Sequence, residues 1–264
     1  MQPGNNVVVS TRLYGGTITQ FSQTIKRFGW EAKFVDFDDE EAVKAAIDDD
    51  TRAVFCEAIA NPGGYITDLG QILLLQDRDQ NATAETQRVL IDGLNKPQGL
   101  VFDGEWLYFS ESGTVSRVLF DHSTGSLADK IETVLQDLPY DLIHKAKAIG
   151  ISPDRKLYVA VGSPCNICEP EDPRYAAMLR SELDGSNPQI YARGLRNSVG
   201  FDWAPWSGDL YATGNARDLL GDNFPPDELN LVVENGFYGW PYVNGDNIPD
   251  PDFGDKRPDL ASSA

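Results

Sequence analysis

Histidine, cysteine and basic residues are all scarce in this 264-residue sequence, and each shortage narrows what the protein can be. Two histidines and three cysteines leave too few clustered ligands for a structural zinc site. Only 22 Lys and Arg residues stand against 41 Asp and Glu residues, so the net charge of −19 disfavours nucleic acids and anionic membranes as partners. Long apolar runs are missing too, since none approaches the roughly 18–20 residues of a membrane-spanning helix.

The N-terminal residues also lack the features of an export signal. Residues 1–16 contain no basic segment and no apolar core of roughly 7–15 residues, so we expect no secretory signal peptide there. With 41% hydrophobic residues, the chain has enough apolar side chains to bury a core.

What the sequence does contain is a pattern that occurs three times, in which two strands flank a tight polar turn. The copies begin at Gly99, Gly150 and Gly200, about 50 residues apart. The second strand of each copy opens on a Leu-Tyr pair: Leu107-Tyr108, Leu157-Tyr158 and Leu210-Tyr211. A strand-rich repeat of roughly 40–50 residues has the length of a β-propeller blade. We therefore expect the chemistry at the mouth of a central channel, where loops from several blades converge.

The first 69 residues follow a different pattern, in which predicted strands alternate with helices. We expect strands at Val7–Ser10, Ala32–Phe37 and Arg52–Ile59, with helices at Phe21–Phe28 and Asp39–Asp48. Such alternation favours an α/β unit with a parallel sheet.

Three stretches of this first part match a known pattern: LYGGT (Leu13–Thr17), FVD (Phe34–Asp36) and the run Thr51–Pro62. They resemble the cofactor domain of PLP-dependent transsulfuration enzymes, the group of O-acetylhomoserine sulfhydrylases and cystathionine synthases. The resemblance implies that Tyr14 stacks on the pyridoxal ring and that Asn61 lies near the cofactor. The Schiff-base lysine of that family comes later in its sequence, where this chain has already changed pattern. We therefore expect no pyridoxal phosphate chemistry.

The rest of the chain contains the motifs GLRN, DELNL and YGWP, in that order. They lie in His144–Ser163, Tyr191–Pro205 and Gly208–Tyr242, which with Leu94–Phe102 resemble the soluble glucose/sorbosone dehydrogenases. The resemblance runs from about residue 70 to 254. It implies a six-bladed propeller that oxidises a sugar or aldehyde with pyrroloquinoline quinone and calcium. Members of that family are commonly periplasmic or secreted.

The same resemblance gives roles to five residues. His144 stands where the family has the base that takes the hydroxyl proton of an aldose, which suits a neutral imidazole. Arg196 and Asn197, in GLRN, stand where a fixed cation and an amide contact the quinone oxygens. The loop after the third repeat implies calcium ligation by the main-chain carbonyls of Ala216 and Arg217, since calcium accepts main-chain oxygens.

The cysteines and the second histidine have simpler interpretations. Cys165 and Cys168 form a C-x-x-C motif with no second pair for zinc and no thioredoxin-like βαβ context, so we interpret it as a loop staple, or a disulfide if the protein is exported. Cys56 lies in an apolar run and is interpreted as an inert core thiol. His122 lies in a predicted turn and is interpreted as a solvated residue.

The predicted fold class is mainly β: a short α/β fragment at residues 1–69 and a partial β-propeller at residues 70–264. At about 50 residues per blade, the second part makes roughly four blades. Because propellers protect their strand edges by closing the ring, we expect this arc to be unstable or to self-associate through open edges. The join between the two parts is consistent with a natural fusion or a gene-assembly artefact.

The favoured function is a truncated sugar or aldehyde oxidoreductase that uses pyrroloquinoline quinone, in an active or inactive form. The alternatives are a non-catalytic propeller fragment used for binding and a fragment of a PLP-dependent enzyme of sulfur amino-acid metabolism.

Overall fold

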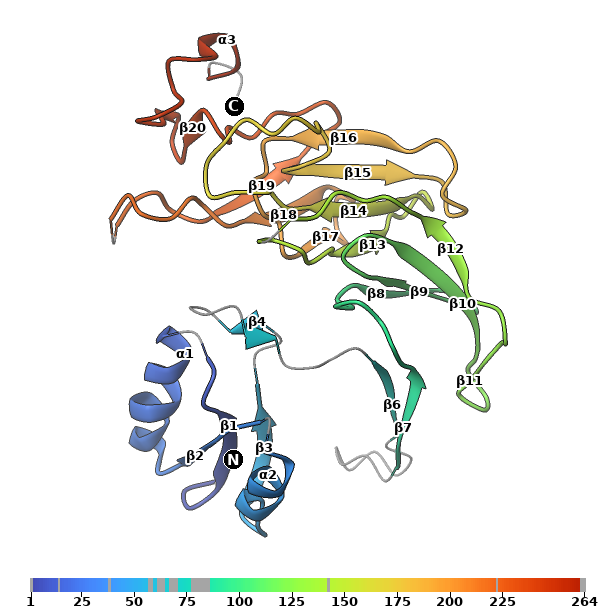
Figure 1. Ribbon diagram of the computed structural model, residues 1–264, viewed down its shortest axis with the longest axis vertical. Helices are drawn as coiled ribbons and strands as arrows, with labels where there is room; N and C mark the ends of the chain where they lie inside the picture. Colours follow the sequence, from blue (N-terminus) through green and yellow to red (C-terminus); the bar gives the residue numbers. More distant parts are fainter. Residues whose placement is uncertain are drawn as a thin grey trace. The chain divides into compact units, whose positions relative to one another are not determined.

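Figure 1 shows the computed structural model of the chain, in which two units are described separately, Met1–Leu69 and Gly70–Ala264. The structure describes residues 2–13, 15–37, 39–56, 59–60, 65–66, 71–76, 86–141, 143–221 and 223–261. None of the helices within these ranges is both long and apolar enough to cross a membrane.

The first unit is built on a parallel sheet with the strand order β2–β1–β3. The central strand β1 (Asn6–Ser10) is buried along its whole length, and it pairs with β2 (Glu31–Val35) and β3 (Thr51–Phe55). A separate short pair joins β4 (Ile59–Ala60) to β5 (Tyr65–Ile66). The prediction of a parallel α/β unit is confirmed.

The helices of the first unit lie in the connections between these strands. The segment α1 (Gly15–Thr19) continues into a π-helical turn at Gln20–Thr24 and a 3-10 turn at Ile25–Phe28. The second helix, α2 (Glu40–Ala46), begins where the Asp39 side chain accepts a hydrogen bond from the Ala42 amide at 3.0 Å. Cys56 is unpaired and only half-buried, which corrects its interpretation as a core residue, because β3 ends one residue before it.

The second unit consists of antiparallel sheets that follow one another along the chain. Their strands are β6 (Ile72–Gln76) and β7 (Thr86–Ile91); β8 (Leu100–Asp103), β9 (Trp106–Ser110), β10 (Val115–Asp121), β11 (Ser126–Leu127) and β12 (Glu132–Leu135); β13 (Ile149–Ile151), β14 (Leu157–Val161), β15 (Ala177–Ser181) and β16 (Gln189–Arg193); β17 (Phe201–Trp203), β18 (Leu210–Gly214) and β19 (Glu228–Val232); and β20 (Val243–Asn244) with β21 (Ile248–Pro249).

The three copies of the sequence repeat form the first two strands of three consecutive sheets, β8–β9, β13–β14 and β17–β18 (Figure 1). This confirms a mainly β architecture after a small α/β segment. This unit also contains a short helix, α3 (Pro258–Ala261), which opens on a proline, a residue that suits the first helical position.

Neighbouring sheets pack face to face because their strands bury side chains on both faces. In β14, Leu157, Val159 and Val161 belong to a cluster shared with β9, β10 and β12 of the preceding sheet. The alternate residues Tyr158 and Ala160 belong to a second cluster, shared with β18 and β19 of the following sheet. Successive side chains of a strand point to opposite faces, so one strand joins two layers.

The repeated glycines mark the places where the first strands of adjacent sheets approach each other. A Cβ atom on Gly99 would lie 2.6 Å from Cγ1 of Ile149, and one on Gly150 would lie 2.8 Å from the Phe201 ring. Neither position has room for a side chain, so packing between sheets explains the glycine in these two copies of the repeat.

Candidate functional site

The candidate residues of the second unit lie in loops at one end of two adjacent sheets. His144 precedes β13, Arg196 and Asn197 lie between β16 and β17, and Ala216 and Arg217 follow β18. In an antiparallel sheet, the start of one strand lies beside the end of its neighbour, so loops that precede one strand and follow the next come together at the same end of the sheet.

His144 is held by Ser163, which follows the neighbouring strand β14. The Nδ1 atom of His144 lies 3.0 Å from the Ser163 carbonyl oxygen and 2.9 Å from Ser163 Oγ. A carbonyl oxygen only accepts hydrogen bonds, and the Ser163 hydroxyl itself donates to the carbonyl of Cys165 at 2.8 Å. Nδ1 therefore carries the proton, and in the neutral ring Nε2 is the basic atom.

The surroundings of His144 favour the neutral ring. Burial lowers the pKa of His144, and the positive charge of Arg196 lowers it further. The hydrogen bond to Ser163 and the negative charge of Asp218 act in the opposite direction, while Lys147 lowers the pKa again. The result is an imidazole that is ready to accept a proton at neutral pH.

Asn197 lies beside His144, with Gly162 between them. A Cβ atom on Gly162 would lie 2.5 Å from Cβ of His144 and 2.8 Å from Oδ1 of Asn197. Among the described residues no hydrogen-bond partner satisfies the Asn197 side-chain amide, although its backbone carbonyl accepts from the Asn215 amide at 3.0 Å. An amide without a partner next to a basic imidazole can donate to a ligand oxygen.

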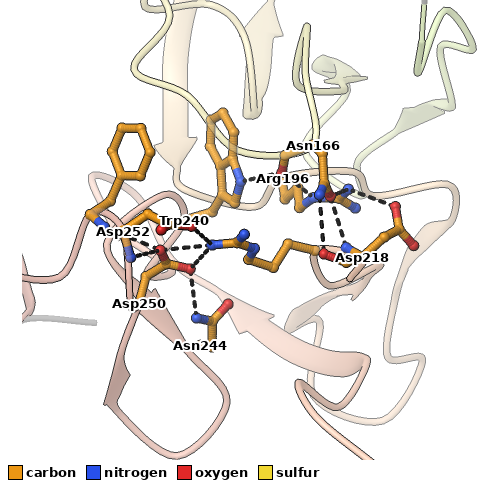
Figure 2. A network of polar contacts seen from close by, with 9 residues as sticks. Asn166, Arg196, Asp218, Trp240, Asn244, Asp250 and Asp252 are labelled. Carbon is orange, nitrogen blue, oxygen red and sulfur yellow. Dashed lines mark hydrogen bonds and ion pairs between the residues drawn. The ribbon is translucent and has the colours of Figure 1, made fainter. Parts of the chain in front are cut away.

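Arg196 is a fixed cation, as Figure 2 shows. Only 4% of the residue is exposed. Its Nε and Nη2 atoms donate to the carbonyl and to Oδ1 of Asn166, at 3.1 and 2.9 Å, and its Nη1 atom donates to the Asn215 carbonyl at 2.9 Å. Asp218 lies 3.5 Å from Nη2, and its exposed side chain leaves the charge of Arg196 only partly compensated.

Asn166 connects several parts of the site and was not among the predicted residues. Besides Arg196, its carbonyl accepts from Trp240 Nε1 at 3.2 Å, and its side chain exchanges hydrogen bonds of 2.8 and 3.1 Å with the backbone of Asp218 (Figure 2). A disulfide joins Cys165 to Cys168 around it. The predicted crosslink of this loop is confirmed. The C-x-x-C motif gave no reason, however, to select Asn166 between the two cysteines.

The loop of Ala216 and Arg217 is held by side chains from later in the sequence. The Ala216 amide donates to Oδ1 of Asp227 at 2.9 Å, and Arg217 pairs with the buried Asp250 and with Asp252. These contacts leave the Ala216 and Arg217 carbonyls as the candidate ligands. The described residues contain no cluster of three or more His, Cys, Asp or Glu side chains that could hold a metal ion.

One observation in this loop fits an oxygen-binding cation. The side-chain oxygen of Asn215, directly before Ala216, is buried without a hydrogen-bond partner. An orphaned acceptor next to main-chain carbonyls matches the all-oxygen ligand set of calcium. A cavity of about 20 Å³ lies here, lined by residues that include Arg196, Asn215 and Ala216.

Lys147 is a second residue that the sequence did not single out. Only 1% of it is exposed, and its Nζ donates to the carbonyl of Lys145 at 3.0 Å. Burial lowers the pKa of Lys147 to about 8. Its charge contributes to the lowered pKa of His144.

The two residues predicted to contact a pyridoxal cofactor, Tyr14 and Asn61, lie outside the described residues. His122 lies in an exposed turn, which confirms its interpretation as a solvated residue. Its Nε2 atom is 3.0 Å from the Gly104 carbonyl oxygen.

Comparison with known families separates the two parts of the chain. Residues 1–91 match the family of Cys/Met metabolism PLP-dependent enzymes, and residues 105–262 match the Glucose / Sorbosone dehydrogenase family. In the first part, the homocysteine/cysteine synthase of Saccharomyces cerevisiae is 42% identical over 72 residues, which cover 27% of this chain and 16% of that enzyme. The first part therefore resembles a fragment of a PLP-dependent enzyme.

Two solved structures resemble this chain in fold. The calcium structure of the family AA12 carbohydrate-active enzyme of Trichoderma reesei is 22% identical, with a TM-score of 0.56, over 70% of this chain and 55% of that one. The PQQ-bound aldose sugar dehydrogenase of Streptomyces coelicolor is 21% identical, with a TM-score of 0.51, over 72% of this chain and 64% of that one. This chain thus spans less than two thirds of the length of either structure.

Proposed function

This chain belongs to the glucose / sorbosone dehydrogenase family through residues 105–262, and we propose that this region is a sugar or aldehyde oxidoreductase that uses pyrroloquinoline quinone and calcium. The observation that supports the proposal most strongly is the arrangement of His144. Ser163 holds its Nδ1 proton, its Nε2 is basic, and an amide without a partner lies beside it. Oxidation of a hydroxyl requires a base for its proton. The amide beside this base can donate to a ligand oxygen.

Each residue then has a defined task. Nε2 of His144 takes the hydroxyl proton of the substrate, and Ser163 keeps the ring in the tautomer that can do so. Arg196 supplies a fixed positive charge and Asn197 supplies an amide donor, both toward the oxygens of the bound quinone. The quinone, when bound, supplies the acceptor for the hydride that leaves the substrate carbon.

Calcium would be held by oxygen atoms of the loop after β18. The carbonyls of Ala216 and Arg217 are the proposed ligands, and the unpartnered Oδ1 of Asn215 offers a third oxygen in the same loop. The proposed ion would place positive charge in a chain whose net charge is −19.

We further propose that the four sheets beginning at β6, β8, β13 and β17 are blades of a six-bladed propeller. The support is the buried cluster that each pair of adjacent sheets shares, together with the repeat of glycine and Leu-Tyr in three of them.

Substitution of the two histidines tests the proposed function. With pyrroloquinoline quinone and calcium added, His144→Ala should lower dye-coupled oxidation of aldoses by roughly 10²- to 10⁴-fold, the usual contribution of a general base. Quinone affinity should remain, because His144 is assigned to the substrate proton. His122→Ala is the matched control and should keep full activity. Full activity of His144→Ala would show that the base assignment is wrong.

A further inference from the structure

The disulfide between Cys165 and Cys168 encloses a residue that contacts both sides of the candidate site. The two cysteines are three positions apart, so Asn166 and Ile167 are the residues inside the closed loop. A loop this short leaves Asn166 little backbone freedom, because the crosslink fixes both of its ends.

Every polar group of Asn166 that faces the site is in use. Its carbonyl oxygen accepts from Arg196 Nε and Trp240 Nε1, and its Oδ1 accepts from Arg196 Nη2 and the Asp218 amide. Its Nδ2 donates to the Asp218 carbonyl. Both the backbone oxygen and the side chain of Asn166 bind Arg196, so a shift of its backbone and its rotamer together would leave the guanidinium held by the Asn215 carbonyl alone among its hydrogen bonds.

The same loop is also linked to His144. The Cys165 carbonyl accepts the hydroxyl hydrogen of Ser163, and the Ser163 oxygens hold Nδ1 of His144. In addition, the Ser163 amide donates to the Arg196 carbonyl at 2.7 Å. His144 and Arg196 are therefore both attached to one crosslinked loop, over sequence separations of 30 residues for Asn166–Arg196 and 19 for His144–Ser163.

We propose that Asn166 is a positioning residue, and that the Cys165–Cys168 disulfide holds it where it fixes Arg196 beside His144. Reduction of the disulfide then releases Asn166, and with it the alignment of Arg196 and Asp218. The catalytic role of this positioning rests on the proposed function. The contacts of Asn166 with Arg196 and Asp218 can nevertheless be tested without any quinone.

The reductive step involves a small dithiol such as dithiothreitol. The dithiol gives two electrons and two protons to the sulfur atoms of Cys165 and Cys168, the S–S bond breaks, and two thiols form. The reductant becomes a cyclic disulfide. Cys56 is already a free thiol, so within the described residues the Cys165–Cys168 crosslink is what the reagent changes.

The experiment compares the oxidised full chain with the chain reduced by dithiothreitol, by amide hydrogen exchange and by NMR titration of the two histidines. In the reduced chain the Asp218 amide should exchange roughly tenfold faster, because its acceptor Oδ1 is no longer fixed. The pKa of His144 should rise, since Arg196 no longer stays beside the ring. The other charged groups that act on this ring are Asp218 and Lys147.

Two variants separate positioning from a general loss of structure. Asn166→Ala with the disulfide intact should show the same two changes as reduction, and its reduction should add little. Asn95→Ala is the control, since it removes an exposed asparagine side chain from the loop between β7 and β8 and should change neither signal. The His122 resonance, from an exposed turn, should be the same before and after reduction at any one pH.

Unchanged Asp218 exchange and His144 titration in the reduced chain, or in a Cys165→Ser, Cys168→Ser double variant, would overturn the proposal. With the quinone present, reduction should also weaken its binding by roughly tenfold, since charge-assisted hydrogen bonds are lost. If the oxidised chain binds no quinone, the proposed function fails while the exchange and titration data still decide whether Asn166 positions Arg196.

Discussion

The Nη1 atom of Arg217 lies 2.8 and 2.7 Å from the two carboxylate oxygens of Asp250, in an ion pair that is almost entirely buried. Burial opposes ionisation of Asp250, but hydrogen bonds from Asn244 and Arg217 outweigh it and lower the pKa of Asp250. Because Arg217 directly follows Ala216, the pair anchors the loop proposed to bind calcium.

We expect Asp250→Ala to reduce the free energy of unfolding by about 3 kcal/mol, because it leaves the Arg217 charge buried with only the exposed Asp252 as a partner. Urea unfolding measures the loss. The control is Arg155→Ala, which breaks the ion pair between the exposed Arg155 side chain and Asp103 and should cost less than about 1 kcal/mol. Equal losses in the two variants would contradict a special role for the buried pair.

The buried Lys147 makes stability depend on pH in a defined range. No carboxylate among the described residues pairs with its ammonium group, so Lys147→Met should raise the free energy of unfolding at pH 7 by roughly 1–3 kcal/mol. The exposed Lys130→Met is the control and should change it by less than about 0.5 kcal/mol.

The pH dependence of this gain follows from the lowered pKa of Lys147, about 8 in the folded chain against an ordinary value of 10.5. Between these values the unfolded chain binds more protons than the folded chain, so wild-type stability rises with pH. The advantage of Lys147→Met should therefore be constant below pH 8 and shrink as the pH rises toward 10.5. Thermal melting of both proteins across this pH range checks the prediction. A stability advantage of Lys147→Met that grows with pH would contradict it.

The repeated glycines provide a test of the packing between sheets. Gly150→Ala would place a methyl group 2.8 Å from the Phe201 ring, and we expect a loss of about 1–3 kcal/mol from overpacking. Gly200→Ala occupies the same position of the repeat, but its nearest atom, Oγ1 of Thr213, is 3.9 Å away. That variant should be nearly neutral in chemical denaturation. A neutral Gly150→Ala would mean that the sheets do not approach as closely as described.

The strands of the second unit could be predicted because their signal is local. The apolar runs and the Leu-Tyr pairs fall within single strands such as β14, and the turn residues lie next to them. Because such a strand is apolar throughout, both of its faces can pack against neighbouring sheets, and Leu157 and Tyr158 enter different clusters.

The contacts that build the site are not local, and the sequence could not show them. Asn166 lies 30 residues from Arg196 and 74 from Trp240, and Arg217 lies 33 residues from Asp250. Only the three-dimensional arrangement brings these partners together. The C-x-x-C motif indicated a crosslink, but it gave no reason to select the asparagine inside it.

Calorimetric titration of the full chain with pyrroloquinoline quinone, with and without calcium, tests the central claim most directly. The proposed site predicts saturable binding of one quinone per chain that requires calcium and weakens when Arg196 is replaced by Ala. A folded chain, shown by cooperative melting, that takes up no quinone in the presence of calcium would contradict the assignment of His144, Arg196 and Asn197 to a working oxidoreductase site.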